Sequence, residues 1–180
     1  MRIESVVIIM VGLLSSQAIA EKSWTVDPTQ GTLTFTVDIG GAVAQGEFGE
    51  WTAEIIFFPK SPSDGAVTVT VDVASVTIDD ARAQAIAEEG WLGVGAYPIA
   101  IFTSESFDPS NEAQLTVPGT LTLKDISAPM ELFGTLVVDN CMAEATATGP
   151  LDRTQHDIGA GQSAVEPIVN ITATLIAHCD

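Results

Sequence analysis

The sequence predicts an all-β protein, an antiparallel barrel or sandwich of about eight strands with one short helical insertion. Apolar and polar residues alternate through most of the chain, as in residues 66–76, where four valines fall on one side of an extended strand. Turn formers separate the alternating stretches at short intervals, as in barrels and sandwiches. Only residues 78–92 interrupt this rhythm, with a run of helix formers.

The first 20 residues have the pattern of a secretory signal peptide. Arg2 provides a basic start, residues 6–14 are apolar, and residues 18–20 form a small-x-small cleavage site. The apolar run is shorter than the ~20 residues that a membrane-spanning helix needs. We therefore expect cleavage after Ala20, export to the periplasm, and a single mature domain over residues 21–180.

The strands follow one another with short connections. Leu33, Phe35 and Val37 alternate with threonines, and Pro98 fits only the start or edge of a strand. Turn chemistry in residues 124–129 joins two stretches as a hairpin. In order, the expected strands lie at Trp24 and in residues 31–40, 51–58, 66–76, 97–107, 113–123, 129–139 and 167–177.

Residues 78–92 predict a short helix between strands. Asp79 or Asp80 can serve as its N-cap, and Gly90 offers a C-terminal stop. Such an insertion often covers the mouth of a barrel. Trp91 follows it directly, where a cover would meet the opening.

The charge balance excludes some partners. The chain carries 6 basic and 24 acidic residues, a formal net charge of −18, which removal of Arg2 and Glu4 with the signal peptide leaves unchanged. Such a surface repels nucleic acid and anionic lipid headgroups. We expect neither nucleic-acid binding nor stable membrane insertion, although a basic protein partner would be attracted.

The two cysteines, Cys141 and Cys179, predict a single disulfide. An even number of cysteines in an exported chain favours a bridge over free thiols. A metal site would need more Cys or His residues nearby, and only His178 is adjacent.

A succession of short motifs resembles the YceI-like family of exported, lipocalin-like proteins. The resemblance covers nearly the whole mature chain and depends on the order of the motifs rather than on any one of them. The motifs are "WTVDPTQGTLTFTV", "GEFGEW", "YPIAIFTSESF", "VPGTLTLKDISAPMEL", "LDRTQHDIG" and "IVNITATLIA". The chain departs from the family pattern at Asp38, Ala83 and Lys124-Asp125.

The resemblance implies an extended eight-stranded, lipocalin-like barrel with a hydrophobic lumen. It implies binding of a long amphiphile, such as an isoprenoid quinone or a polyprenyl lipid, in the periplasm. It supplies no general catalytic residues and no covalent cofactor. Some relatives are associated with membrane di-haem b-type cytochromes, so docking on such a complex through the acidic surface is an alternative function.

The alternating pattern alone leaves a filled core and a ligand cavity equally open, because an eight-stranded barrel can be either. The resemblance favours the cavity. We expect the ligand to be lined by residues on the inward faces and beside the insertion: Phe35, Val37, Val69, Val71, Trp91, Leu92, Phe102, Leu121, Leu123, Leu132 and Leu136.

Catalytic and metal-binding hypotheses have weak support. His156 lies between Asp152 and Asp157, with Ser163 further on, but no nucleophile motif accompanies them. Two histidines without ligand spacing do not predict a metal site. We therefore expect a binding protein rather than an enzyme, with Asp152 and Arg153 in a structural role.

Overall fold

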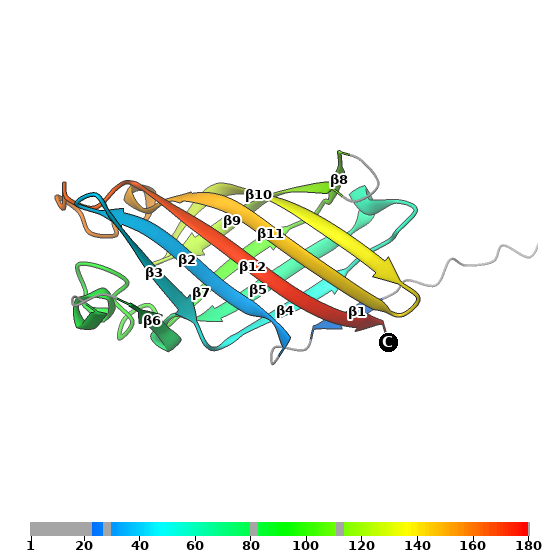
Figure 1. The fold of residues 1–180 in the computed structure, drawn as a ribbon, viewed down its shortest axis with the longest axis horizontal. Coiled ribbons are helices and arrows are strands. Elements are labelled where there is room, and N and C mark those ends of the chain that lie inside the picture. Colours follow the sequence, from blue (N-terminus) through cyan, green and yellow to red (C-terminus); the bar gives the residue numbers. More distant parts are fainter. Residues whose placement is uncertain (1–22, 27–29, 80–82, 111–113, 180) are drawn as a thin grey trace, which may run out of the picture.

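The computed structural model describes residues 23–26, 30–79, 83–110 and 114–179, so the predicted signal peptide and its cleavage site lie outside the described residues. In this part the chain forms one sheet of twelve strands (Figure 1). The strands are β1 (Ser23–Val26), β2 (Thr32–Ile39), β3 (Ala42–Phe48), β4 (Trp51–Ile56), β5 (Ala66–Asp72), β6 (Val76–Ile78), β7 (Ile99–Ser104), β8 (Asp108–Pro109), β9 (Gln114–Leu123), β10 (Ile126–Asp139), β11 (Met142–Asp152) and β12 (Ile168–Cys179).

The strands pair antiparallel throughout and curl around an interior. Their order is β1-β4-β5-β7-β9-β10-β11-β12-β2-β3-β6, with β8 added to β9. Strand β1 pairs with both β4 and β12, and this second pairing closes the sheet on itself. The all-β antiparallel architecture predicted from alternation is thus confirmed.

The predicted number of about eight strands is wrong. Part of the difference comes from local breaks: the Asp72 carboxylate accepts a hydrogen bond from the backbone N–H of Ala74, and the 3-10 helix Val73–Ser75 that begins there separates β5 from β6. Strands β3 and β11 are also additional to the expected set. In β11 three of the side chains that turn inward are alanines, at 143, 145 and 147, so the apolar alternation is weaker than in the other strands.

The insertion contains a 3-10 helix rather than an α-helix. Its described helical part is η4 (Ala83–Ala87), followed by turns to Tyr97. The described part of this 3-10 run has five residues, although the segment is rich in helix formers. Within the described ranges, no helix is long and apolar enough to cross a membrane.

The largest buried cluster lies in the half of the barrel that contains β1 and the ends of β10 and β12. A cluster of buried side chains fills this half, and it includes Trp24, Trp51, Phe57, Phe102 and Phe107. The rings of Phe57 and Phe107 meet edge to face at 5.4 Å between centroids. Two smaller clusters occupy the other half.

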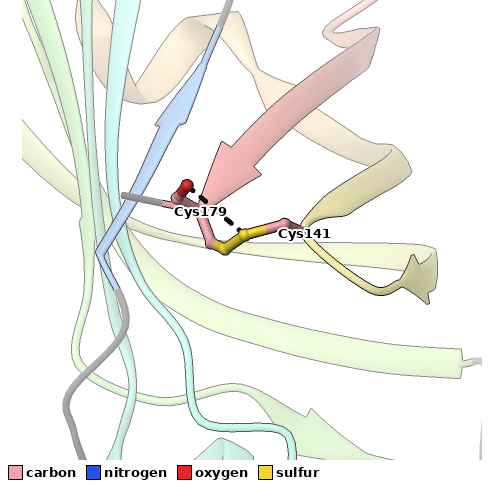
Figure 2. The surroundings of a disulfide bond; sticks show 2 residues. All are labelled: Cys141 and Cys179. Carbon is pink, nitrogen blue, oxygen red and sulfur yellow. Dashed lines mark hydrogen bonds between the residues drawn. A yellow bond between two sulfur atoms is a disulfide. The ribbon is translucent and has the colours of Figure 1, made fainter.

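The predicted disulfide between Cys141 and Cys179 is present. Cys141 lies in the turn between β10 and β11, and Cys179 ends β12, with the two Cα atoms 5.0 Å apart (Figure 2). The backbone N–H of Cys179 also donates to the Cys141 carbonyl at 3.2 Å. The bridge therefore fastens the C-terminal strand to the neighbouring hairpin at the densely packed end.

Candidate ligand-binding site

An apolar cavity of about 190 Å³ lies in the half of the barrel away from the disulfide. Eighteen of the described residues line it, and all of these except Arg153 and Gln162 are apolar. The turn after β2, the insertion with η4 and the loop between β11 and β12 gather at this end of the barrel, on the left of Figure 1. We call this end the open end, and the disulfide end the packed end.

The barrel and two covering segments form the cavity wall. Strands β2 and β12 contribute Phe35 and Val37, and Val169 and Ile171, at alternating inward positions. The insertion, residues 83–97, contributes Ile86, Trp91 and Leu92. Residues 157–166, the covering loop, contribute Ile158 and Val165. A cavity with strand walls and a cover made of loops suits a molecule that enters from one end.

The structure brings five of the eleven expected ligand contacts to the cavity: Phe35, Val37, Trp91, Leu92 and Leu123. The other six do not line it. Phe102 belongs to the cluster that fills the packed end, and the remaining five pack against that cluster: Val69, Val71, Leu121, Leu132 and Leu136. Their side chains face the interior as expected, but at a different level along the barrel.

Several lining residues were absent from the expected set. Phe48 ends the unrecognised strand β3, and Val169 and Ile171 occupy alternate positions of β12 that inward-facing periodicity could have identified. Ile158 and Val165 are apolar residues within a polar, turn-rich stretch, and both are buried. An isolated apolar residue in such a loop is the sequence feature that could have identified these two contacts.

Arg153 holds the covering loop in place. Its side chain is 5% exposed, and its five N–H groups donate to five backbone carbonyl oxygens at 2.6–3.1 Å. A guanidinium has only five N–H donors, so a ligand oxygen would have to displace one of these carbonyls. The acceptors are the carbonyls of Ile158, Gly159, Gln162, Val165 and Glu166.

His156 is a buried structural residue. It is 1% exposed, and its Nδ1 lies 3.3 Å from the Leu123 carbonyl oxygen and 3.1 Å from that of Ile126. Both partners can only accept, so Nδ1 carries the proton. The ring thereby supports the β9–β10 turn, where Lys124 and Asp125 have φ of 53° and 59°. This geometry gives no support to the catalytic hypothesis for His156.

The insertion and the covering loop are fastened to each other. The Trp91 ring lies so close to Gly159 that a Cβ there would be 2.7 Å from the ring, and Gly159 has a φ of 60°. The Gly159 N–H donates to the Gly90 carbonyl at 2.8 Å. Lys124 Nζ donates to the carbonyls of Glu89 and Asp157. These contacts join the insertion and the covering loop to each other at the open end.

Asp152 begins the 3-10 helix η5 (Arg153–His156). Its carboxylate accepts hydrogen bonds from the hydroxyl of Thr154 at 2.6 Å and from the Thr154 N–H at 3.0 Å. These bonds stabilise the ionised form and lower the pKa of Asp152, with smaller contributions from Gln155 and the Arg153 charge. The predicted structural role of Asp152 agrees with this geometry.

The chemistry of the cavity is that of binding to apolar surface. Gln162 brings an uncharged polar side chain to the wall, with an amide that can both donate and accept. Among the described residues, no group of three or more His, Cys, Asp or Glu side chains is placed to hold a metal ion.

Fold and cavity together define an extended antiparallel β-barrel with an apolar internal site under a loop cover at one end. A sequence model of the YceI-like domain matches residues 24–177. The chain belongs to the YceI-like family.

Relatives of known sequence are 28–29% identical to this chain over the parts that align. A UPF0312 protein of Shewanella putrefaciens is 28% identical over 130 residues, which are 69% of this chain and 68% of that protein. Protein YceI of Escherichia coli O157:H7 is 29% identical over 100 residues, covering 55% of this chain and 52% of the relative.

Solved structures have the same fold. BcnA of Burkholderia cenocepacia superposes with a TM-score of 0.79 at 24% identity, over 84% of this chain and 98% of that one. A domain of Saccharophagus degradans, described as a polyisoprenoid binding domain implicated in plant cell wall breakdown, has a TM-score of 0.67 at 12% identity, over 87% of this chain and 98% of that domain.

Proposed function

We propose that this protein binds the apolar part of an amphiphile, such as an isoprenoid quinone or a polyprenyl lipid, and carries it through the periplasm. The observation that carries the proposal is the cavity of about 190 Å³ at the open end, with sixteen apolar residues among its eighteen. The likeness to a polyisoprenoid binding domain supports the same ligand class. The signal-peptide pattern of residues 1–20 supports the periplasmic location.

Burial of a hydrocarbon chain supplies the affinity. Each buried methylene contributes ~0.8 kcal/mol, part of which is offset by ordering the chain and immobilising the ligand. A site of this kind needs few polar contacts and selects by shape and length. Such a lining suits binding without a chemical reaction. That the protein is not an enzyme stays a prediction.

Docking on a membrane cytochrome complex, the alternative implied by the resemblance, gains no support. Neither the described residues nor the related proteins indicate a partner protein. The acidic composition that suggested it is explained equally by a solvated surface.

Filling the cavity tests the proposal. Val169 is half-buried and lines the cavity, so Val169→Phe places a ring where the ligand would lie. We expect the affinity for a short-chain isoprenoid quinone to fall by about tenfold or more, because several methylenes of the ligand can no longer be buried. Isothermal titration calorimetry measures this on the purified mature protein.

The matched control is Val137→Phe. Val137 is 61% exposed on β10, near the packed end, so the same substitution adds the same bulk away from the cavity. Affinity should be unchanged in this control. Equal affinities in Val169→Phe and the unsubstituted protein, with both folded, would place the ligand elsewhere.

A further inference from the structure

The covering loop is firmly attached to the barrel. The buried guanidinium of Arg153 donates to five carbonyl oxygens of this loop. At the end of the loop, the Glu166 N–H donates to the Asp38 carbonyl of β2 at 2.9 Å, and Val165 forms an isolated β-bridge with Ile39. The loop is therefore the fixed one of the two segments that meet at the open end.

The insertion has a different pattern of hydrogen bonds. The backbone N–H groups of Glu88, Leu92 and Gly93 donate to carbonyls of the insertion itself. Among the described residues, its hydrogen bonds to other segments lie at Glu89 and Gly90, whose carbonyls accept them. Segments held by few external hydrogen bonds open at lower free energy than segments held by many. The insertion is therefore the segment that can move.

The two segments meet at Gly90, Trp91 and Gly159, which we call the seam. The Gly159 N–H donates to the Gly90 carbonyl at 2.8 Å, and the Trp91 ring lies against Gly159. Trp91 also lines the cavity. Movement of the insertion away from the covering loop would therefore take part of the cavity wall with it and expose the apolar interior.

Lys124 spans the seam from a third element. It lies in the turn between β9 and β10, and its Nζ donates to the Glu89 carbonyl of the insertion at 3.3 Å and to the Asp157 carbonyl of the covering loop at 3.1 Å. Both hydrogen bonds are exposed to solvent, so water can replace them when the segments separate. One side chain thus holds the two segments together reversibly.

We propose that the seam is the gate through which the ligand enters and leaves the cavity, and that Lys124 is its latch. The inference rests on the proposed function. Lys124 is not among the described residues that line the cavity, and the carbonyls it contacts belong to the backbone of the closed gate. The latch therefore stabilises the closed gate equally with and without ligand. It governs the rate of exchange and not the affinity.

Lys124→Met tests the latch, because methionine keeps a long side chain and removes the donors. For a short-chain isoprenoid quinone, the association and dissociation rate constants should both rise by about fivefold or more, with the dissociation constant within about twofold. Stopped-flow quenching of tryptophan fluorescence measures association, and displacement by an excess of a prenyl alcohol measures dissociation. The matched control is Lys60→Met, at an exposed position beyond the end of β4, which should leave both rate constants unchanged.

Two glycines of the covering loop test the seam. Gly159 and Gly161 have φ of 60° and 78°, so alanine costs a similar backbone strain at either position. A Cβ at Gly159 would lie 2.7 Å from the Trp91 ring, whereas a Cβ at Gly161 would meet no described atom within 4 Å. Gly159→Ala should push Trp91 from the seam and raise the association rate constant by about threefold or more over that of Gly161→Ala.

The outcomes separate the gate from the proposed function. Calorimetry on the unsubstituted protein comes first, and failure of both the quinone and the prenyl alcohol to bind overturns the proposed function and the gate with it. With binding intact, unchanged rate constants in folded Lys124→Met, or a change in the dissociation constant alone, overturn the latch and leave the carrier function standing. Equal association rate constants in the two glycine variants overturn the seam as the route. Urea titration verifies folding, and Lys124→Gln replaces Lys124→Met if that variant does not fold.

Discussion

Arg153 shows how a single side chain shapes the candidate site. Its guanidinium contacts no carboxylate at hydrogen-bond distance in the described residues and instead satisfies five backbone carbonyls of the covering loop. A buried carbonyl without a partner is costly, and a loop without regular structure has few other donors. Arg153 therefore replaces secondary structure as the organiser of this segment.

Exchange of Arg153 for lysine tests this role. Lysine keeps the charge but has three donors instead of a planar set of five, so Arg153→Lys should lower the free energy of unfolding by about 2 kcal/mol or more. Urea titration measures the loss, and limited proteolysis should locate new cleavage within residues 157–166.

The control for this exchange is Lys60→Arg, the reverse substitution at an exposed position. We expect it to change stability by no more than about 0.5 kcal/mol. An Arg153→Lys protein with unchanged stability and an equally resistant loop would contradict the assigned role.

Alternation predicted which residues face inward but not how deep they lie. Every one of the eleven expected contacts packs in the interior or lines the cavity. Periodicity of two assigns a side chain to a face of the sheet, and the level along the barrel depends on strand stagger, which a single sequence does not contain. Five of the eleven therefore fall at the cavity and six outside it.

At the scale of elements, the strands with small inward residues were the ones missed. Ala143, Ala145 and Ala147 turn inward on β11, where Ala145 pairs with Leu136 and Leu175, and a Cβ at Gly149 would meet the Leu132 side chain at 2.8 Å. The space left by neighbouring side chains determines which residues fit on the inner face of such a strand. Its own propensity gives little signal, because alanine and glycine favour neither face.

The disulfide acts at the same scale, by fastening the end of β12 to the β10–β11 turn. It closes a loop of 38 residues, for which the chain-entropy relation gives roughly 4 kcal/mol of stabilisation. Replacing both Cys141 and Cys179 with serine should lower the free energy of unfolding by about that amount. A lower urea midpoint measures this loss. Because the bridge lies at the packed end, ligand affinity should remain within about twofold.

The unsubstituted protein, measured before and after reduction of its disulfide, is the internal control for the serine variant. An unchanged midpoint in both cases would show that the paired strands alone hold this end together. A folded but non-binding serine variant would instead connect the disulfide to the cavity, which the geometry does not.

At the scale of the whole molecule, the barrel is filled at one end and hollow at the other. The sequence left these two states as alternatives, and the structure combines them. Composition could not distinguish them, because valine, leucine and phenylalanine serve equally as core and as cavity lining. The motif order, by contrast, was sufficient to recognise the family that residues 24–177 match.

The exterior and the interior favour the same kind of ligand. A formal charge of −18 repels anionic molecules, and the donors of Arg153 in the cavity wall are already engaged by backbone carbonyls. A neutral amphiphile avoids both penalties. Quinones and prenyl alcohols meet this condition better than prenyl phosphates do.

Native mass spectrometry tests the central claim most directly. The protein is expressed with residues 1–20, purified without detergent, and then extracted with solvent. The account predicts a stoichiometric adduct whose extract contains a neutral prenyl lipid or quinone. A mass equal to that of the bare chain, unchanged after incubation with quinones and prenyl alcohols, would contradict the claim that the cavity is a ligand site.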